Sequence, residues 1–205
     1  MPTTPDQKLW TRTRQAVHAE VARTAMELFL SRGFEATTID DIAAAAGISR
    51  RSFFRYFGTK EDIVLGDLAA QGELIRKELE ARPADEDAWT ALLNALRDAP
   101  RLGQDDATML KISKMLYETP SLRARSIEKH LQWQALLTPE IRRRLGVAPD
   151  DEDDLRADAI VACMLACLDI AGEAWTRSNG SRSLEELVLS AVAAVRPSAP
   201  DPRRS

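Results

Sequence analysis

Apolar residues recur at the spacing of an α-helix along almost the whole chain, and this limits the fold more than any other feature. Val17, Val21, Ala25, Leu28 and Phe29 form one face of a helix predicted over residues 10–32. The same spacing predicts about nine helices in all, the others near 39–46, 50–57, 60–80, 85–98, 105–118, 121–144, 152–178 and 183–195. No stretch alternates apolar and polar residues between hairpin turns, so the sequence predicts an all-α protein.

Composition and charge suggest two helical domains between short tails. Residues 1–9 and 197–205 are polar and rich in proline, and we expect them to be disordered. Residues 1–60 hold nine Lys and Arg against six Asp and Glu, whereas the whole chain has a net charge of −4. A mildly basic module at 10–60 on an acidic body at 61–196 suits an anionic partner at one end only.

Several classes of protein are disfavoured by the residues that the chain lacks. The N-terminus does not have the order of a signal peptide, and the apolar run at 159–175 is interrupted by Asp169 and Glu173, so a cytoplasmic protein without a membrane span is expected. Cys163 and Cys167 lie four apart in a helical pattern, which suggests neither a disulfide nor a metal site. No nucleophile and base, metal set or cofactor loop is visible in the spacing, so neither an enzyme nor a cofactor is predicted, although residues can also converge in space.

The segment GISRRSFFRYFGTKED at 47–62 concentrates cations and aromatic rings in an acidic protein. On a helix over 50–57, Arg50, Arg51, Phe54 and Arg55 fall on one arc, while the other three aromatic residues fall on a second arc that can pack inward. Thr38 and Ser49 are plausible N-caps of the two short helices, and Gly47 turns the chain between them. This order of helix, tight turn and outward basic face is typical of a helix-turn-helix, although exposed arginines also occur on ordinary solvated surfaces.

A helix-turn-helix places the first turn of its second helix against base edges in the major groove of DNA. Arg50 and Arg51 lie in that turn, and an arginine fork can bond both O6 and N7 of guanine. Phe54 can contact a thymine methyl group. The starts of the second and fourth helices, at Thr38 and at Thr59 and Lys60, are expected to hold backbone phosphates.

Four spaced motifs from about Val17 to Val64 resemble the TetR family of bacterial transcription regulators: AMELF at 25–29, GFEATT at 33–38, IDDIAAAAGIS at 39–49 and FFRYFGTKED at 53–62. The resemblance implies a three-helix helix-turn-helix domain, a homodimer that reads a palindromic operator, and repression as the usual mode. It also implies that Thr38, Tyr56 and Lys60 hold phosphates while Arg50, Arg51 and Phe54 lie near bases. The full set expected at double-stranded DNA is Thr38, Ser49, Arg50, Arg51, Ser52, Phe54, Arg55, Tyr56 and Lys60.

The second domain is expected to bind a small, largely apolar effector. ETPSLRAR and LTPEIRRRLGV are similar to a TetR subset with acyl-CoA-like ligand domains and to mycofactocin-associated regulators. The expected effector is acyl-CoA-like or another hydrophobic molecule. Its expected contacts are Met109, Ile112, Met115, Leu116, Tyr117, Trp133, Leu137, Cys163 and Cys167, each of which would equally serve as ordinary core.

The last two predicted helices carry small and apolar residues that can form the family's four-helix dimer contact. The residues expected there are Ala166, Ile170, Ala174, Leu184, Leu187, Val188, Ala191 and Val195. The same spacing also fits helices buried within one chain. Two other functions stay open: a helical interaction module, and a constitutive DNA-binding protein without an effector. The helix predicted at 60–80 would join the two domains as a lever.

Overall fold

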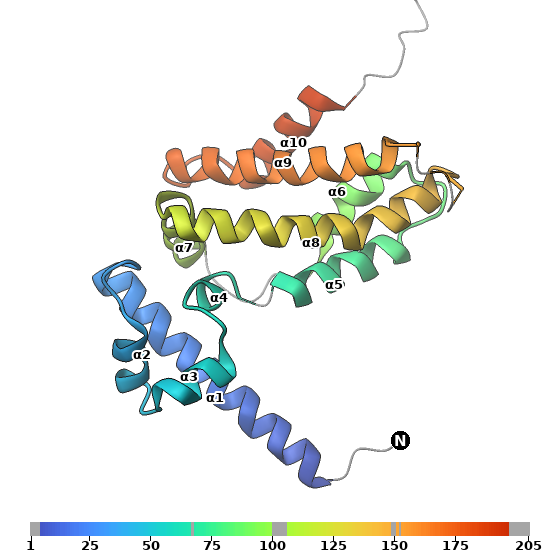
Figure 1. Ribbon diagram of the computed structural model, residues 1–205. Coiled ribbons are helices and arrows are strands. Elements are labelled where there is room, and N and C mark those ends of the chain that lie inside the picture. The colour runs from blue at the N-terminus through green and yellow to red at the C-terminus, as the bar shows by residue number, and fades with distance from the viewer. Residues whose placement is uncertain (1–4, 67, 100–105, 149–150, 152, 197–205) are drawn as a thin grey trace, which may run out of the picture.

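The computed structural model describes residues 5–66, 68–99, 106–148, 151 and 153–196. Within these residues the chain forms ten helices and no strand, which confirms the all-α prediction (Figure 1). The helices are α1 Pro5–Arg32, α2 Ile39–Ala45, α3 Arg50–Tyr56, α4 Glu61–Val64, α5 Leu68–Ala81, α6 Ala88–Asp98, α7 Asp106–Glu118, α8 Pro120–Arg144, α9 Arg156–Arg177 and α10 Leu184–Val195. α1 begins five residues before the expected start at residue 10, while residues 1–4 and the expected tail at 197–205 lie outside the described chain.

Glycines and hydroxyl caps set the short elements of the first domain. α1 ends at Arg32 and is followed by Gly33, whose φ of 90° suits glycine far better than other residues. Thr38 starts α2 with a reciprocal capping box: its hydroxyl accepts the N–H of Asp41, and the Asp41 carboxylate accepts the N–H of Thr38. Ser49 caps α3 through the N–H of Ser52. Both predicted caps are confirmed.

The first domain has its own aromatic core, the first core, and one residue of the second domain belongs to it. Phe29, Ile42 and Phe53 are almost completely buried there, and Ile63 and Leu65 join them from beyond the expected boundary at residue 60. Leu122 of α8 is also fully buried in this core. The two domains are therefore joined by packing as well as by the chain.

The prediction of one helix over residues 60–80 is wrong, because the structure has two helices there. α4 ends at Val64, and the chain then passes through Gly66 at a φ of 59°, in the left-handed region that glycine tolerates. α5 begins at Leu68. The segment between the domains is therefore two separate helices and not one continuous helix.

The second domain is a bundle built around α8 and α9. Figure 1 shows these two long helices side by side, with α5 against α8 and α10 against α9. Leu92, Leu137, Ile141, Val161 and Met164 are fully buried at its centre. Gly72 of α5 lets the ring of Trp133 approach, because a Cβ there would lie 2.7 Å from the Trp133 ring. The core thus depends on small residues as well as large ones.

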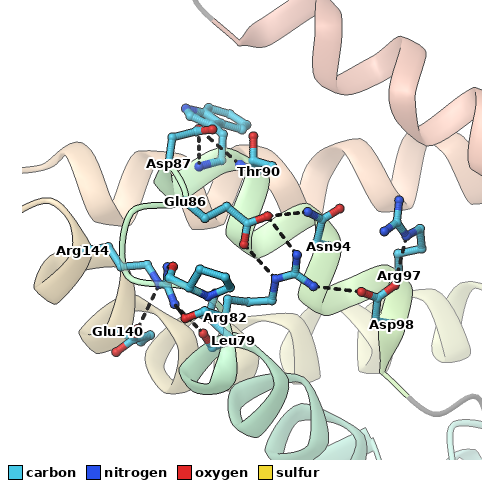
Figure 2. A network of polar contacts seen from close by, with 12 residues as sticks. Leu79, Arg82, Glu86, Asp87, Thr90, Asn94, Arg97, Asp98, Glu140 and Arg144 are labelled. Atoms are coloured by element: carbon cyan, nitrogen blue, oxygen red, sulfur yellow. Dashed lines mark hydrogen bonds and ion pairs between the residues drawn. The ribbon is translucent and has the colours of Figure 1, made fainter.

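A buried arginine joins the far end of α8 to the turn after α5 (Figure 2). The Arg144 side chain is only 1% exposed; its Nε donates to Glu140 Oε1 at 2.9 Å, and its Nη atoms donate to the carbonyls of Leu79, Arg82 and Pro83 at 2.7–2.9 Å. Arg82 in turn pairs with Glu86 and Asp98. Arg144 therefore adds hydrogen bonds to one carbonyl in the last turn of α5 and to two carbonyls in the turn that follows it.

Among the described helices, α9 is the one that is long and apolar enough to cross a membrane, with 22 residues and a mean hydropathy of 1.5. Length and composition alone support this, and the core helix of a soluble protein meets the same test. The side chains of Val161, Met164 and Leu165 are buried in the bundle. Ala159, Ala162, Ala166 and Ile170 form an exposed stripe at helical spacing on the same helix. α9 is thus a bundle helix with one uncovered apolar face.

Candidate nucleic-acid interface and effector region

α3 has the two faces that its sequence predicts. Phe53 and Phe57 are 0% and 5% exposed in the first core, and the Phe53 ring lies 5.6 Å from that of Phe57. Arg51, Phe54 and Arg55 are exposed on the opposite side. Ser49 and Ser52 are occupied with the N-cap, where their hydroxyls lie 3.0 Å apart. The buried aromatic residues therefore fix the helix and leave a cationic surface outward.

The first arginine of α3 is held from two directions. Arg50 Nη1 donates to Asp40 Oδ2 of α2 at 2.7 Å, and its guanidinium carbon lies 5.8 Å from the centre of the Phe54 ring. Both charged side chains are largely exposed. They border a surface hollow of about 560 Å³ between the start of α2, α3 and the turn at 58–61.

Tyr56 lies between the two faces of α3, as expected from its position on the inward arc. Its side chain is half-buried and packs at the edge of the first core. The guanidinium carbon of Arg55 lies 5.2 Å from the centre of the Tyr56 ring, and Arg55 Nη2 is 3.5 Å from its hydroxyl. Tyr56 thus offers its polar end next to an exposed cation.

Lys60 has a structural role that its sequence position does not reveal. Its side chain is 20% exposed, and Nζ donates to the carbonyls of Phe34 and Thr37 at 3.0 and 3.3 Å. The ammonium also lies 4.3 Å from the centre of the Phe34 ring. Lys60 therefore ties the turn after α3 to the loop before α2, and two of its three N–H donors are engaged there.

Thr38 is similarly occupied. Its hydroxyl and its N–H both donate to Asp41 Oδ2, at 2.5 and 2.9 Å. A hydrogen bond from the hydroxyl to a phosphate would have to replace the bond to Asp41. The capping box lowers the pKa of Asp41, mainly through the hydrogen bonds from Thr38, so its carboxylate is firmly ionised at neutral pH.

The residues expected at an effector divide between the two cores. Trp133, Leu137 and Cys167 are buried in the bundle, where burial raises the pKa of the Cys167 thiol. Met115 and Leu116 pack instead against the first core. Met109 is exposed, and Ile112, Tyr117 and Cys163 are half-buried. The buried and partly buried members of the set thus pack in two different cores.

A polar cluster between α7, α8 and α9 is absent from the sequence prediction. Tyr117 donates its hydroxyl to the Asp169 carbonyl at 3.0 Å, and Gly172 leaves the space for this hydroxyl. Arg123 Nη2 donates to Glu173 at 3.0 Å. Burial raises the pKa of Tyr117, so the phenol stays protonated. Because Arg123 and Glu173 are fifty positions apart, no local spacing signals this cluster.

His130 of α8 is another titratable group near this cluster. Burial lowers the pKa of His130, although the charge of Asp169 opposes that shift. No group of three or more potential metal ligands occurs in the described part of the chain.

The residues expected at a dimer contact also divide into two groups. Leu187 and Val188 are buried within the bundle of the same chain, while Ala174, Leu184 and Ala191 pack at its edge. Ala166, Ile170 and Val195 are exposed, with Ile170 at 59%. For Leu187 and Val188 the intrachain alternative is therefore the one observed.

Two parts of the chain match known family models. Residues 22–66 match the family described as "Bacterial regulatory proteins, tetR family", and residues 86–200, more than half of the chain, match "MftR C-terminal domain". The HTH-type transcriptional regulator TcmR of Streptomyces glaucescens is 34% identical over 76% of this chain and 71% of its own length. The chain belongs to the TetR family of transcription regulators. It is thus a DNA-binding regulator and not an enzyme.

Other TetR-family relatives cover still more of the chain. The putative mycofactocin biosynthesis transcriptional regulator MftR of Mycobacterium tuberculosis is 29% identical over 86% of this chain and 88% of its own length. Among solved structures, the TetR-family repressor FadR of Thermus thermophilus, in complex with lauroyl-CoA, covers 90% of this chain and 98% of its own, with a TM-score of 0.56 and 24% identity. A TetR-family regulator from Rhodococcus sp. covers 88% and 98%, with a TM-score of 0.54 and 16% identity. These structures show the shared fold.

Proposed function

We propose that this TetR-family protein is a dimeric, effector-responsive repressor that reads a palindromic DNA operator through α3. The observation that carries the proposal is the outward surface of α3, where Arg51, Phe54 and Arg55 are exposed above a buried Phe53. A helix of this kind fits the major groove, and its first turn carries two arginines that can bond guanine. Several relatives with comparable sequences are named transcriptional repressors.

A homodimer is supported by the uncovered face of α9 and α10. Ala166 and Ile170 on α9 and Leu189 and Val195 on α10 are exposed, although they are small or apolar. Burying such a surface against its two-fold copy removes apolar area from water and places two α3 helices on one DNA molecule. Two reading helices about one helical turn apart then select a palindrome.

For DNA contacts we retain the expected residues and separate their roles. Arg50, Arg51 and Phe54 contact bases. Ser49 and Ser52 hold the start of α3. Arg55 and Tyr56 face the DNA backbone. Thr38 and Lys60 lie at the same surface, but their donors are largely engaged within the protein. We therefore assign them to shaping the interface first and to phosphate contact second.

The effector is proposed to be small and largely apolar, with an acyl-CoA-like molecule as the first candidate. The match of residues 86–200 to the MftR C-terminal domain and the FadR structure with lauroyl-CoA suggest this chemistry for related domains. In this chain, the half-buried Ile112, Tyr117 and Cys163 are the places where a moderate opening of α7 and α9 would admit an apolar chain. Arg123 is the nearby cation for an anionic end, and Glu173 pairs with it here.

Release from DNA would follow from the contacts between the domains. Met115 and Leu116 of α7 and Leu122 of α8 pack against the first core. A shift of these helices would therefore move the first domain, which carries α3. An effector that binds a shifted conformer better must weaken DNA binding by the difference in its affinity for the two conformers. A protein with this role acts in the cytoplasm, where the DNA is.

Selection of DNA fragments by the purified protein at fixed salt tests the proposal. We expect a palindromic site to be enriched, and lauroyl-CoA to raise the melting temperature and release the site while CoA alone does neither. No enriched site would contradict operator binding and favour a helical interaction module. Suppose instead that neither lauroyl-CoA nor other apolar thioesters release the protein from its site or raise its melting temperature. That result would favour a constitutive DNA-binding protein.

A further inference from the structure

Asp40 is an acid on the surface where the proposed function places DNA. It is the second residue of α2, its side chain is 67% exposed, and it lies in the border of the hollow beside α3. DNA phosphates repel a carboxylate at such a position, so Asp40 would weaken DNA binding unless it has another role there. The cap of α2 does not supply one, because Asp41 makes both capping hydrogen bonds.

The contact of Asp40 is with the first residue of the reading helix. Arg50 Nη1 donates to Asp40 Oδ2 at 2.7 Å, and the Phe54 ring lies 5.8 Å from the guanidinium carbon. An unrestrained arginine at the start of α3 would sample many rotamers, and a base contact would then have to order it. A guanidinium held by a carboxylate on one side and a ring on the other is already oriented.

The contact leaves enough of the guanidinium for DNA. Arginine has five N–H donors, and Asp40 accepts from Nη1 alone. A bidentate contact to O6 and N7 of guanine needs two of the others. The Arg50 side chain is 59% exposed, so most of it is open to solvent.

We propose that Asp40 is a specificity-determining positioning residue, which holds Arg50 of α3 so that its open edge meets a guanine of the operator. The inference rests on the proposed function, since it refines how α3 reads DNA. A positioning role differs from simple competition, in which the ion pair with Asp40 would keep Arg50 from contacting DNA. Removing a positioning acid lowers selectivity at one base pair, whereas removing a competitor raises affinity without that loss.

The test uses the full-length protein and the operator that it selects. Binding of wild type, Arg50→Ala, Asp40→Ala, Asp40→Asn and the Asp40→Ala/Arg50→Ala double variant is measured on duplexes with single base-pair changes, at one salt concentration. Glu35→Gln is the matched control, because Glu35 is a similarly exposed acid of the same hollow that faces Lys60 and not Arg50. Exposed substitutions of this kind leave the fold intact, which the melting temperatures verify.

We expect Arg50→Ala and Asp40→Ala to lose selectivity at the same base pair, by roughly 5- to 150-fold for a lost bidentate contact. The double variant should lose no more than Arg50→Ala alone. Asp40→Asn should recover part of the selectivity, because its carbonyl still accepts from Arg50. Glu35→Gln should tighten binding to all duplexes alike and keep the selectivity.

Unchanged selectivity in Asp40→Ala, with or without tighter binding, would overturn the inference and leave the proposed function standing, provided that wild type selects a site. Additive losses in the double variant would overturn it as well, because the two residues would then act separately. Failure of wild type to select any site would overturn the proposed function and this inference with it.

Discussion

Asp62 of α4 lies 3.4 Å from Arg125 of α8, measured from Oδ1 to Nη2, and so pairs the reading domain with the second domain. Lys129 Nζ lies 3.7 Å from the same oxygen. The other carboxylate oxygen accepts the N–H of Thr59 at 3.0 Å, and the Thr59 hydroxyl accepts the N–H of Asp62 at 3.3 Å. One side chain thus closes the turn after α3 and contacts the helix whose Leu122 enters the first core.

Asp62→Ala should therefore lower the free energy of unfolding by about 1–2 kcal/mol, because the turn loses its reciprocal cap and α8 loses an ion pair. Operator affinity should fall as well, since the turn positions the end of α3. Chemical denaturation and operator titration measure the two effects. Glu128→Ala is the control, because Glu128 is an exposed carboxylate of α8 that also pairs with Arg125; an equal loss in that variant would contradict the role of Asp62.

The charge of Asp62 also predicts a pH dependence. Partial burial works against ionisation, but the hydrogen bonds from Thr59 and the charges of Lys129 and Arg125 outweigh it and hold the pKa below its ordinary value. A depressed pKa stabilises the fold above the unfolded value of about 4, and this contribution disappears as the pH falls further. The stability difference between wild type and Asp62→Asn should thus be constant from pH 5 to 7 and shrink below about pH 4. A difference that is as large at pH 3 would show that charge is not its cause.

Arg144 and Arg143 offer a matched pair for the buried network of Figure 2. Both bond Glu140, but Arg144 is 1% exposed and also holds three carbonyls, whereas Arg143 is 57% exposed. Arg144→Leu should cost about 3 kcal/mol, because it breaks a buried ion pair with Glu140 and removes three hydrogen bonds to carbonyls, which leaves Glu140 paired only with the exposed Arg143. Arg143→Leu should cost less than about 1 kcal/mol. Denaturation at pH 7 measures both, and similar losses would mean that the buried contacts of Arg144 add nothing.

Arg51 and Lys60 should separate DNA contact from structure. Arg51 is exposed and has no hydrogen bond among the described contacts, so Arg51→Ala should keep the melting temperature and weaken DNA binding. Lys60→Met should destabilise the fold by about 1 kcal/mol, because the carbonyls of Phe34 and Thr37 lose a donor. Operator titrations over a range of salt give the second readout: each lost phosphate contact lowers the salt slope by about 1. An unchanged slope with lower stability in Lys60→Met would confine Lys60 to a structural role.

Structural features that depend on residues close together in the sequence could be predicted. The caps at Thr38 and Ser49 and the inward positions of Phe53 and Phe57 are local features, and all were predicted and observed. The break at Gly66 within the helix predicted over 60–80 was not foreseen, because a helix can tolerate an isolated glycine. Gly66 has a positive φ, and the preceding residues Ile63 and Leu65 are buried in the first core.

What depends on distant segments was not predicted. The carbonyls that Lys60 holds belong to Phe34 and Thr37, more than twenty positions earlier, and no spacing rule connects them. Leu187 and Val188 have the spacing of any apolar helix face, which does not say whether the surface that buries them belongs to the same chain or to a second copy. In this chain the bundle covers both, and the uncovered residues are those beside them.

The uncovered face gives the last prediction, which concerns the dimer. Ile170 of α9 is 59% exposed next to the exposed Ala166, and Ile127 of α8 is 50% exposed elsewhere on the bundle. Ile170→Lys places a charge in the proposed contact, where its burial is costly, and should convert the dimer to a monomer with much weaker operator binding. Ile127→Lys should leave both unchanged. Sedimentation measures the oligomeric state, and operator titration measures DNA binding. A dimer that survives Ile170→Lys but not Ile127→Lys would place the contact on α8 instead of α9, because a charge destabilises the dimer only where the interface buries it.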